Sequence, residues 1–292
     1  MRQLSDTTWV LEGPCNIGFI VNDDEVTLID SGNDKEAGRK ISKILKEKNW
    51  ELKNIINTHS NADHIGGNNY LQNMTNCNIY TSEIEDAFIQ YPELEKAFLW
   101  GGFEINELRN KFFCAKKSKV TNILRVNEKF QNDLEIISLK GHFLNMIGII
   151  TKDNDVFLAD SVFGENIIDK YGLPFIYDVK EFISTLKKIE KLNARYYIPS
   201  HGQITDNIKP LVIKNIEVVD KAKQQIKKII SSRKTFETIL KEYCDINRIV
   251  LNGGQYALVG STIRSMLTYL ADGNEIEYIF DKNQMLWKTI TV

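Results

Sequence analysis

One segment, Thr58-His59-Ser60-Asn61-Ala62-Asp63-His64-Ile65-Gly66-Gly67, carries two of the four histidines of this chain. The apolar run 52–57 before it predicts a strand, and Gly66-Gly67 predicts the start of a helix toward Leu71. The segment is therefore expected in a loop just past a strand end, where several side chains can turn toward one point.

The spacing within this segment favours metal binding. In an extended loop, residues two apart face the same side, so His59 and Asn61 are expected to point together. Asp63 and His64 lie one turn further on and can face a second point. Imidazole nitrogen and carboxylate oxygen both bind borderline divalent ions such as zinc.

The other two histidines stand in similar surroundings. His142 lies in Gly141-His142-Phe143 and His201 in Pro199-Ser200-His201-Gly202, each after an apolar strand-like run. Asp160 follows the apolar run 156–158, and a carboxylate there would be costly to bury without a partner such as a metal. These side chains would converge if their strands share one edge of the fold.

The remaining pattern predicts a layered α/β or α+β domain, because short strands alternate with amphipathic helices. The expected strands are 8–11, 17–21, 26–29, 123–126, 134–139, 147–151, 156–158 and 196–199, and the expected helices are 35–48 and 179–192.

Residues 82–118 are aromatic-rich and predict a helical insertion. Tyr91, Trp100, Phe103 and Phe113 could form an apolar wall of a substrate cleft, so the insertion could act as a lid. They could equally form a small satellite core.

The predicted pattern of secondary structure changes after about residue 206. Helices at 208–230, 235–243 and 257–271, followed by a hairpin of 276–280 with 284–290, resemble a winged helix. We therefore expect a catalytic domain over 1–206 and an accessory domain over 207–292.

Composition sets limits on function. Net charge is -2 and the pI is about 6.2, so no global basic field recruits nucleic acid. The N-terminus has no apolar core of signal-peptide length, and no segment approaches the roughly 20 apolar residues that cross a bilayer. The cysteines, without C-x-x-C spacing, indicate free thiols in a reducing cytoplasm. The expected location is the cytoplasm, with no membrane partner.

The motif series resembles the metallo-β-lactamase superfamily, in particular glyoxalase-II-like metallo-hydrolases. The resemblance rests on five elements in order and covers about residues 5–205: Asp30-Ser31-Gly32, His59-x-Asn61-x-Asp63-His64, Gly141-His142, Ala159-Asp160 and Ser200-His201-Gly202. It implies a four-layer αββα sandwich with a dinuclear metal site at one edge of the sheets.

The resemblance also implies roles for these residues. The first metal would be served by His59, Asn61 and His142, the second by Asp63, His64 and His201, with Asp160 bridging the two. A metal-bound hydroxide would attack the substrate, and Asp63 would orient it as the catalytic residue. Asp30 would support the ligand loop through hydrogen bonds, although an aspartate before Ser-Gly is also a common turn residue.

Asn61 departs from the family pattern, because it replaces the second histidine of the H-x-H-x-D-H motif. It has no basic nitrogen lone pair, and its amide oxygen is a poor metal donor. We therefore expect a well-occupied second site and a weak or empty first one, with one or two zinc ions per chain and iron or manganese as alternatives.

The expected function is hydrolysis of a small cytosolic ester, thioester or lactone. One alternative is a non-haem iron oxygenase resembling persulfide dioxygenases, with His59, His142 and Asp160 as a facial triad. Another is a catalytically silent metal-binding or regulatory protein. Nucleic acid is a disfavoured partner because helix 257–271 carries one basic residue, Arg264. A homodimer through the accessory domain or the insertion is a further expectation.

Overall fold

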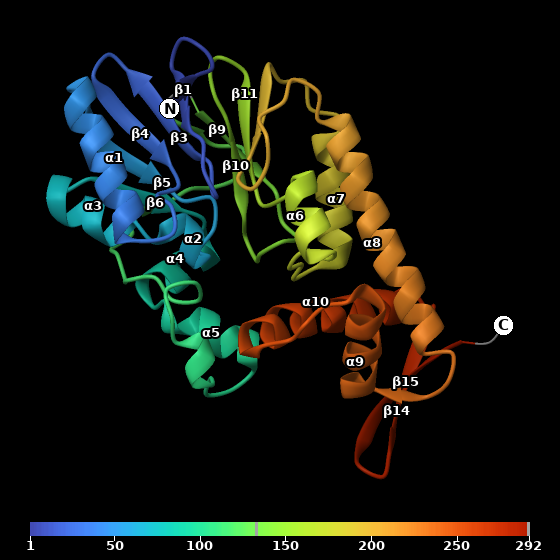
Figure 1. The fold of residues 1–292 in the computed structure, drawn as a ribbon. Coiled ribbons are helices and arrows are strands. Elements are labelled where there is room, and N and C mark those ends of the chain that lie inside the picture. The colour runs from blue at the N-terminus through green and yellow to red at the C-terminus, as the bar shows by residue number, and fades with distance from the viewer. Residues whose placement is uncertain (132–133, 291–292) are drawn as a thin grey trace.

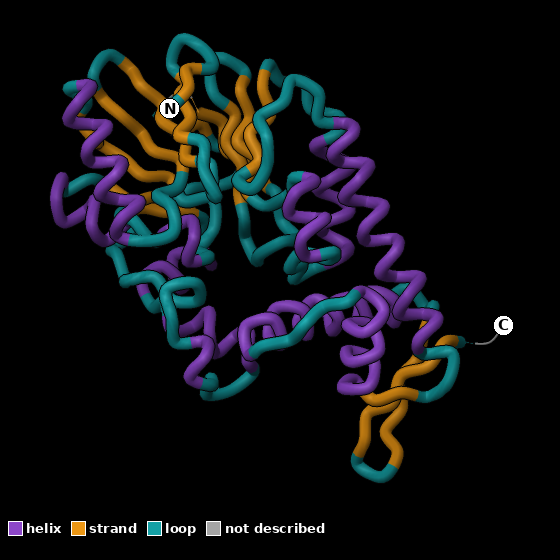
Figure 2. The backbone as a smooth tube through the Cα atoms, in the orientation of Figure 1, coloured by secondary structure: helices purple, strands orange, loops and turns teal. Residues whose placement is uncertain are grey.

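The computed structural model describes residues 1–131 and 134–290, and in it two β-sheets pack face to face with helices on both outer faces (Figure 1). Figure 2 shows the two groups of strands between two groups of helices. The predicted four-layer αββα sandwich is confirmed.

The first sheet has the strand order β1-β2-β3-β4-β5-β6-β7. Its strands are β1 (Arg2–Gln3), β2 (Thr8–Leu11), β3 (Ile17–Asn22), β4 (Glu25–Ile29), β5 (Glu51–Ile56), β6 (Asn78–Thr81) and β7 (Asn122–Ile123). β4 to β7 run parallel, so their carboxyl ends meet at one edge. Helices α1 (Lys35–Lys48) and α3 (Asn68–Thr75) cover the outer face through Ile41, Leu45 and Leu71.

Three details of this sheet differ from the sequence prediction, and the first is strand β1, which pairs with β2 and was not predicted. Strand β6 was not predicted, because its four residues contain no long apolar run. The strand predicted at 123–126 ends at Ile123. A tight turn, in which Glu128 N donates to Arg125 O at 3.1 Å, stops it.

The second sheet has the order β12-β11-β10-β9-β8. Its strands are β8 (Lys129–Phe130), β9 (Leu134–Ser138), β10 (Ile147–Ile150), β11 (Asp155–Ala159) and β12 (Tyr196–Pro199), and the helices beside it are α6 (Glu165–Tyr171), α7 (Val179–Ile189) and α8 (Lys209–Ile229). Helix α6 was not predicted. β11 and β12 run parallel, so the residues after them emerge at the same edge.

The core between the sheets is built from alternate strand residues that face inward. Ile20, Ile29 and Ile56 of the first sheet pack against Ile149 and Phe157 of the second, and all are buried. Ile147 N also donates to Thr58 O at 2.9 Å, which ties the second sheet to the loop after β5. The loops at this edge are therefore held on a rigid base.

The insertion predicted at 82–118 is helical, with α4 (Glu83–Gln90), α5 (Glu93–Trp100) and the short 3-10 helix η1 (Asn106–Leu108). Trp100 and Phe113 join a small apolar cluster with Leu99 of α5. Tyr91 and Phe103 are instead 59% and 85% exposed, so the four aromatic residues do not form one wall.

The C-terminal segment continues from α8 through β13 (Lys234–Thr235), α9 (Phe236–Asn247), α10 (Gly253–Asp272), β14 (Ile276–Asp281) and β15 (Gln284–Thr289). α10 lies across the base of the molecule against α5 and α7 (Figure 1). One continuous apolar core joins this segment to the second sheet. The boundary near residue 206 and the winged-helix assignment stay predictions, and residues 291 and 292 lie outside the described residues.

Within residues 1–131 and 134–290, no helix combines the length and apolar character that a bilayer crossing requires.

Candidate metal centre

The predicted site residues come together at one edge of the sandwich. His59 follows β5, His142 follows β9, Asp160 follows β11 and His201 follows β12. Asn61 precedes the short helix α2 (Ala62–Ile65), and Asp63 and His64 lie on it. The expectation that these strands end at a shared edge is met, whereas the roles of the residues as ligands stay predictions.

Two of the four imidazole rings are anchored by backbone carbonyls. His142 Nδ1 lies 2.8 Å from Phe175 O, and His201 Nδ1 lies 2.6 Å from Pro14 O. A carbonyl oxygen can only accept, so the proton of each neutral ring is on Nδ1. The lone pair of Nε2 then faces the centre.

Asp30 anchors the other two rings. Its Oδ2 lies 2.8 Å from His64 Nδ1 and accepts from Thr58 Oγ1, also at 2.8 Å. Because Thr58 Oγ1 donates to Asp30, it is free to accept from His59 Nδ1 at 3.0 Å. This places the carboxylate behind both histidines, whereas its role in supporting metal ligands stays a prediction. It also gives all four rings the same tautomer.

Three atoms that point into the centre lack a hydrogen-bond partner within the described part of the chain. Among the described residues, His59 Nε2, His64 Nε2 and Asp160 Oδ1 are buried without a hydrogen-bond partner. Leaving such a group unpaired costs about 1–3 kcal/mol, and more for a charged one. A divalent cation would supply the missing partner, so these residues fit a metal centre.

The donor atoms form two groups joined by Asp160. Those of His59, His142 and Asp160 all lie within 4.8 Å of one another. On the other side, His201 Nε2 lies 3.0 Å from Asp63 Oδ2 and 3.4 Å from Asp160 Oδ2, while His64 Nε2 lies 3.5 Å from Asp160 Oδ1. Ligands about 2.0–2.2 Å from a shared ion lie roughly 3–4 Å apart, so each group can hold one ion.

Burial and neighbouring charges shift the pKa values of the histidines in the centre. Burial lowers the pKa of His59 well below its ordinary value, and His64 lowers it further. Burial alone would also lower the pKa of His201, but the carboxylates of Asp160 and Asp63 outweigh it and raise that pKa to about 10. The carboxylates thus favour positive charge at this point, which a divalent cation provides when it displaces the proton.

Asn61 bridges two parts of the chain. Its Oδ1 lies 3.0 Å from His142 Nε2, and its Nδ2 donates to Glu95 Oε1 at 2.7 Å. Glu95 lies on α5, is buried, and was not predicted as a site residue. A signal for it was present, because Glu95 shares a helix face with buried Leu99, one turn away.

A second unforeseen carboxylate holds the ligand loop. Glu85 of α4 accepts from Ser60 N at 3.0 Å and Ser60 Oγ at 2.5 Å, and also from Asn145 N at 2.8 Å. Burial raises the pKa of Glu85 to about 7, although these hydrogen bonds oppose the shift. The insertion therefore fixes the residue between His59 and Asn61.

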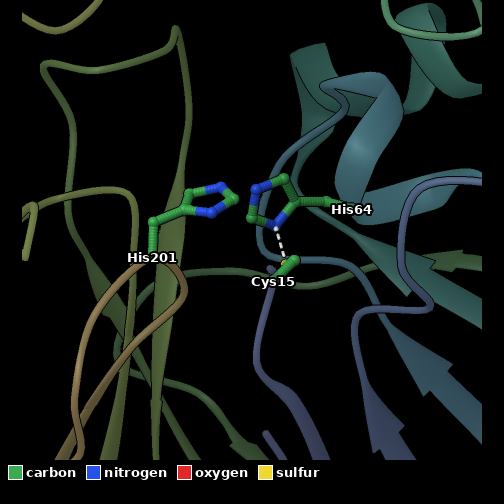
Figure 3. A group of neighbouring side chains, drawn as sticks. All are labelled: Cys15, His64 and His201. Atoms are coloured by element: carbon green, nitrogen blue, oxygen red, sulfur yellow. Dashed lines mark hydrogen bonds between the residues drawn. The ribbon is translucent and has the colours of Figure 1, made fainter. Parts of the chain in front are cut away.

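Cys15 also approaches the centre. Its Sγ lies 3.9 Å from His64 Nδ1, and Figure 3 shows it beside the His64 ring, with His201 on the other side. Cys15, His64 and His201 offer donor atoms within 4.8 Å of one another. All four cysteines are free, as predicted, but no sequence pattern placed Cys15 near the metal residues. The turn that contains it, Gly13-Pro14-Cys15-Asn16, follows a strand end and supplies the carbonyl that anchors His201.

A family model described as the metallo-beta-lactamase superfamily matches residues 10–201. The chain belongs to this superfamily. The predicted family resemblance is therefore confirmed, and the match ends at the last of the predicted metal residues.

Individual superfamily members are distant in sequence. The chain is 22% identical over 241 residues to a beta-lactamase-like protein 2 homolog of Caenorhabditis elegans, covering 79% of this chain and 66% of that protein. It is 21% identical to an atrochrysone carboxyl ACP thioesterase of Aspergillus fumigatus, over 69% of this chain and 55% of that protein. The chain thus spans less than two thirds of the length of these curated relatives.

A solved structure supports the fold over the whole chain. A metallo-beta-lactamase family protein from Thermus thermophilus aligns with a TM-score of 0.79 and 14% identity, covering 99% of this chain and all of that one. At this identity the likeness shows the fold alone.

Asp30→Asn is expected to weaken metal binding by about 10–100-fold with a small loss of stability. An amide nitrogen opposite His64 Nδ1 would set donor against donor, so the ring would move its proton to Nε2 and lose the inward lone pair. Asparagine also tolerates the left-handed backbone of Asp30, whose φ is 62°. Metal affinity by calorimetry would check this, with exposed Asp24→Asn as the control. Unchanged affinity in Asp30→Asn would show that the carboxylate does not set the tautomer.

Proposed function

We propose that this superfamily member is a metal-dependent hydrolase of a small ester, thioester or lactone. The observation that carries the proposal is the set of buried, unpartnered Nε2 and carboxylate atoms that converge at the sheet edge. Hydrolytic chemistry is supported by the superfamily, and one curated relative is named a thioesterase.

A divalent cation, with zinc as the first expectation, would polarise a substrate oxygen and acidify water. The chain's own residues would position the reactants. Asp63 is suited to orient water and accept its proton, because its side chain is 36% exposed while the other carboxylate, Asp160, is 6% exposed. Asp63 Oδ2 lies 3.0 Å from His201 Nε2, so an ion bound by both would hold that carboxylate in place.

Aromatic rings beside the first group support an apolar substrate. Phe98 of the insertion packs edge-on against Phe143 at 5.8 Å between ring centroids and lies 5.4 Å from Tyr177. Phe175 lies edge-on to His142 at 5.4 Å. These rings would exclude water from one side and favour an apolar acyl group. They differ from the aromatic wall expected from the sequence.

The direct test is a panel of S-acyl thioesters, lactones and aryl esters. Hydrolysis is expected with the loaded protein, to fall to background after chelation, and to return with added divalent cation. Replacement His201→Ala should prevent that recovery. If no substrate of the three classes is hydrolysed by protein that holds its full complement of metal, the hydrolase proposal is wrong.

A second function, an iron-dependent oxygenase, is supported by the compact grouping of His59, His142 and Asp160. Two histidines and one carboxylate with open positions are the usual ligands of non-haem iron oxygenases. Oxygen uptake by the Fe²⁺-loaded protein in the presence of a low-molecular-weight persulfide would favour this function over hydrolysis.

The contacts of α10 argue against a nucleic-acid reader. The Arg264 guanidinium lies 3.8 Å from the centroid of the Phe236 ring, and Ser265 Oγ donates to Tyr177 O at 2.6 Å. Thr262 Oγ1 accepts from Ile176 N at 3.1 Å. Because these polar groups are used within the protein, we propose that α10 supports the loop beside His142. A small-molecule substrate, a homodimer and a cytoplasmic location remain proposals.

A further inference from the structure

We propose that Asn61 is an oxygen ligand of the first metal group and that Glu95 is its positioning residue. Together they would shift this group toward harder divalent cations, such as Mn²⁺ or Fe²⁺, relative to a group with histidine at this position. The inference rests on the proposed function only in requiring that a divalent cation occupies the centre.

Two atoms of the first group, His142 Nε2 and Asn61 Oδ1, face each other. His142 Nδ1 donates to Phe175 O, so His142 Nε2 presents a lone pair. Asn61 Oδ1, also an acceptor, lies 3.0 Å from it. Two acceptors at this distance repel unless a cation lies between or beside them. Adjacent ligands about 2.1 Å from a six-coordinate ion are roughly 3 Å apart, so the spacing fits a shared ion.

The Asn61 amide is oriented by its contact with Glu95. Asn61 Nδ2 donates to Glu95 Oε1 at 2.7 Å. A flipped amide would turn Nδ2 toward His142 Nε2, but it would place Oδ1 against Glu95 Oε1 and lose the hydrogen bond to Glu95. Glu95 is 5% exposed, and among the described residues Asn61 is its hydrogen-bond partner. The position of α5 therefore fixes which atom of Asn61 faces the metal.

The first group would offer a metal both nitrogen and oxygen donors. The group would consist of two imidazole nitrogens, from His59 and His142, and two oxygens, from Asp160 and Asn61. Carboxylate and carbonyl oxygens suit Mn²⁺ and similar ions, whereas more nitrogen donors favour zinc. The weakness expected of Asn61 from the sequence would then apply to zinc rather than to all divalent ions.

The experiment measures metal affinities of the chelator-stripped full chain. Mn²⁺ binding is followed by loss of the free-ion EPR signal, and Zn²⁺ binding by competition with a chromophoric chelator. His142→Ala identifies which binding event belongs to the first group. Asn61→Ala is expected to weaken Mn²⁺ there by about 10–100-fold, and Asn61→His to raise the ratio of Zn²⁺ to Mn²⁺ affinity by at least about 10-fold.

Variants of Glu95 separate positioning from general support of the fold. Glu95→Ala is expected to weaken Mn²⁺ by about 10-fold, while Glu95→Gln, which keeps an acceptor for Asn61 Nδ2, should restore most of the loss. Glu93→Ala, an exposed acid on the same helix, is the matched control. If Glu95→Ala fails to fold, Asn61→Ala and Asn61→His decide the matter.

The inference is overturned if Asn61→Ala and Asn61→His both keep the wild-type Mn²⁺ affinity and metal ratio. It is equally overturned if the wild type fills the second group and binds no Mn²⁺ in the first. Hydrolysis is assayed on the same preparations. Metal ratios that shift as expected without any hydrolysis would sink the proposed function and leave the inference standing.

Discussion

Asp160→Ala is expected to remove metal from both groups and to abolish hydrolysis. One oxygen of this carboxylate, Oδ2, lies 3.6 Å from His142 Nε2 and 3.4 Å from His201 Nε2. The other, Oδ1, lies 3.5 Å from His64 Nε2 and is buried without a partner. Asp160 therefore approaches the inward Nε2 atoms of histidines in both groups, so a single substitution would affect both ions.

The expected size follows from the position of the residue. Loss of supporting groups behind a ligand costs about 10–100-fold in metal affinity, and loss of a bridging ligand should exceed that. Activity should fall by at least about 10²–10³-fold, the usual effect of removing one strong electrostatic donor. Metal content by mass spectrometry and kcat/KM on the best substrate of the panel would measure both.

Asp169→Ala is the matched control, because Asp169 is an exposed aspartate on α6. It should keep wild-type metal content and rate. Retention of two ions by folded Asp160→Ala would show that the two groups are independent and that Asp160 does not bridge them.

The sequence allowed prediction of the sandwich and of the four histidine positions for a local reason. His59, His142 and His201 each follow an apolar run that forms a strand, His64 lies five residues after His59, and the strands of these two sheets end at a common edge. Asp160 was found in the same way, since a carboxylate directly after a buried strand needs a partner. These signals lie within a few residues of the side chain concerned.

The supporting residues were missed because their partners are distant in sequence. Glu85 binds Ser60 across 25 positions and Glu95 binds Asn61 across 34. His201 is anchored by Pro14 O across 187 positions. Such contacts depend on how the insertion and the β2–β3 turn pack on the sheets, which periodicity does not encode. The burial of the aromatic residues in the insertion could not be predicted from the sequence for the same reason. Some of these similar side chains are partly buried in the fold and others are exposed.

Gly66→Ala is expected to cause the largest loss of stability, about 3 kcal/mol or more. A Cβ at this position would lie 2.1 Å from both C and O of Asn33 and 2.5 Å from Asp34 N. All three are backbone atoms, so no side-chain rotation can relieve the contact. The backbone that the Cβ would meet lies where α1 begins, because the Asp34 side chain accepts from Glu36 N and Ala37 N.

Any relief would therefore move either the start of α1 or the end of α2, which carries His64. Urea unfolding monitored by circular dichroism would measure the stability, with Gly102→Ala as the control. At Gly102 an added Cβ meets its nearest atom, Trp100 Cδ1, at 4.0 Å, so the change should stay within about 0.5 kcal/mol. If Gly66→Ala unfolds at the same urea concentration as the wild type, the loop at Asn33 moves away from the added Cβ at little cost in free energy. In that case Gly66 would not be required for close packing, and His64 would be positioned mainly by its bond to Asp30.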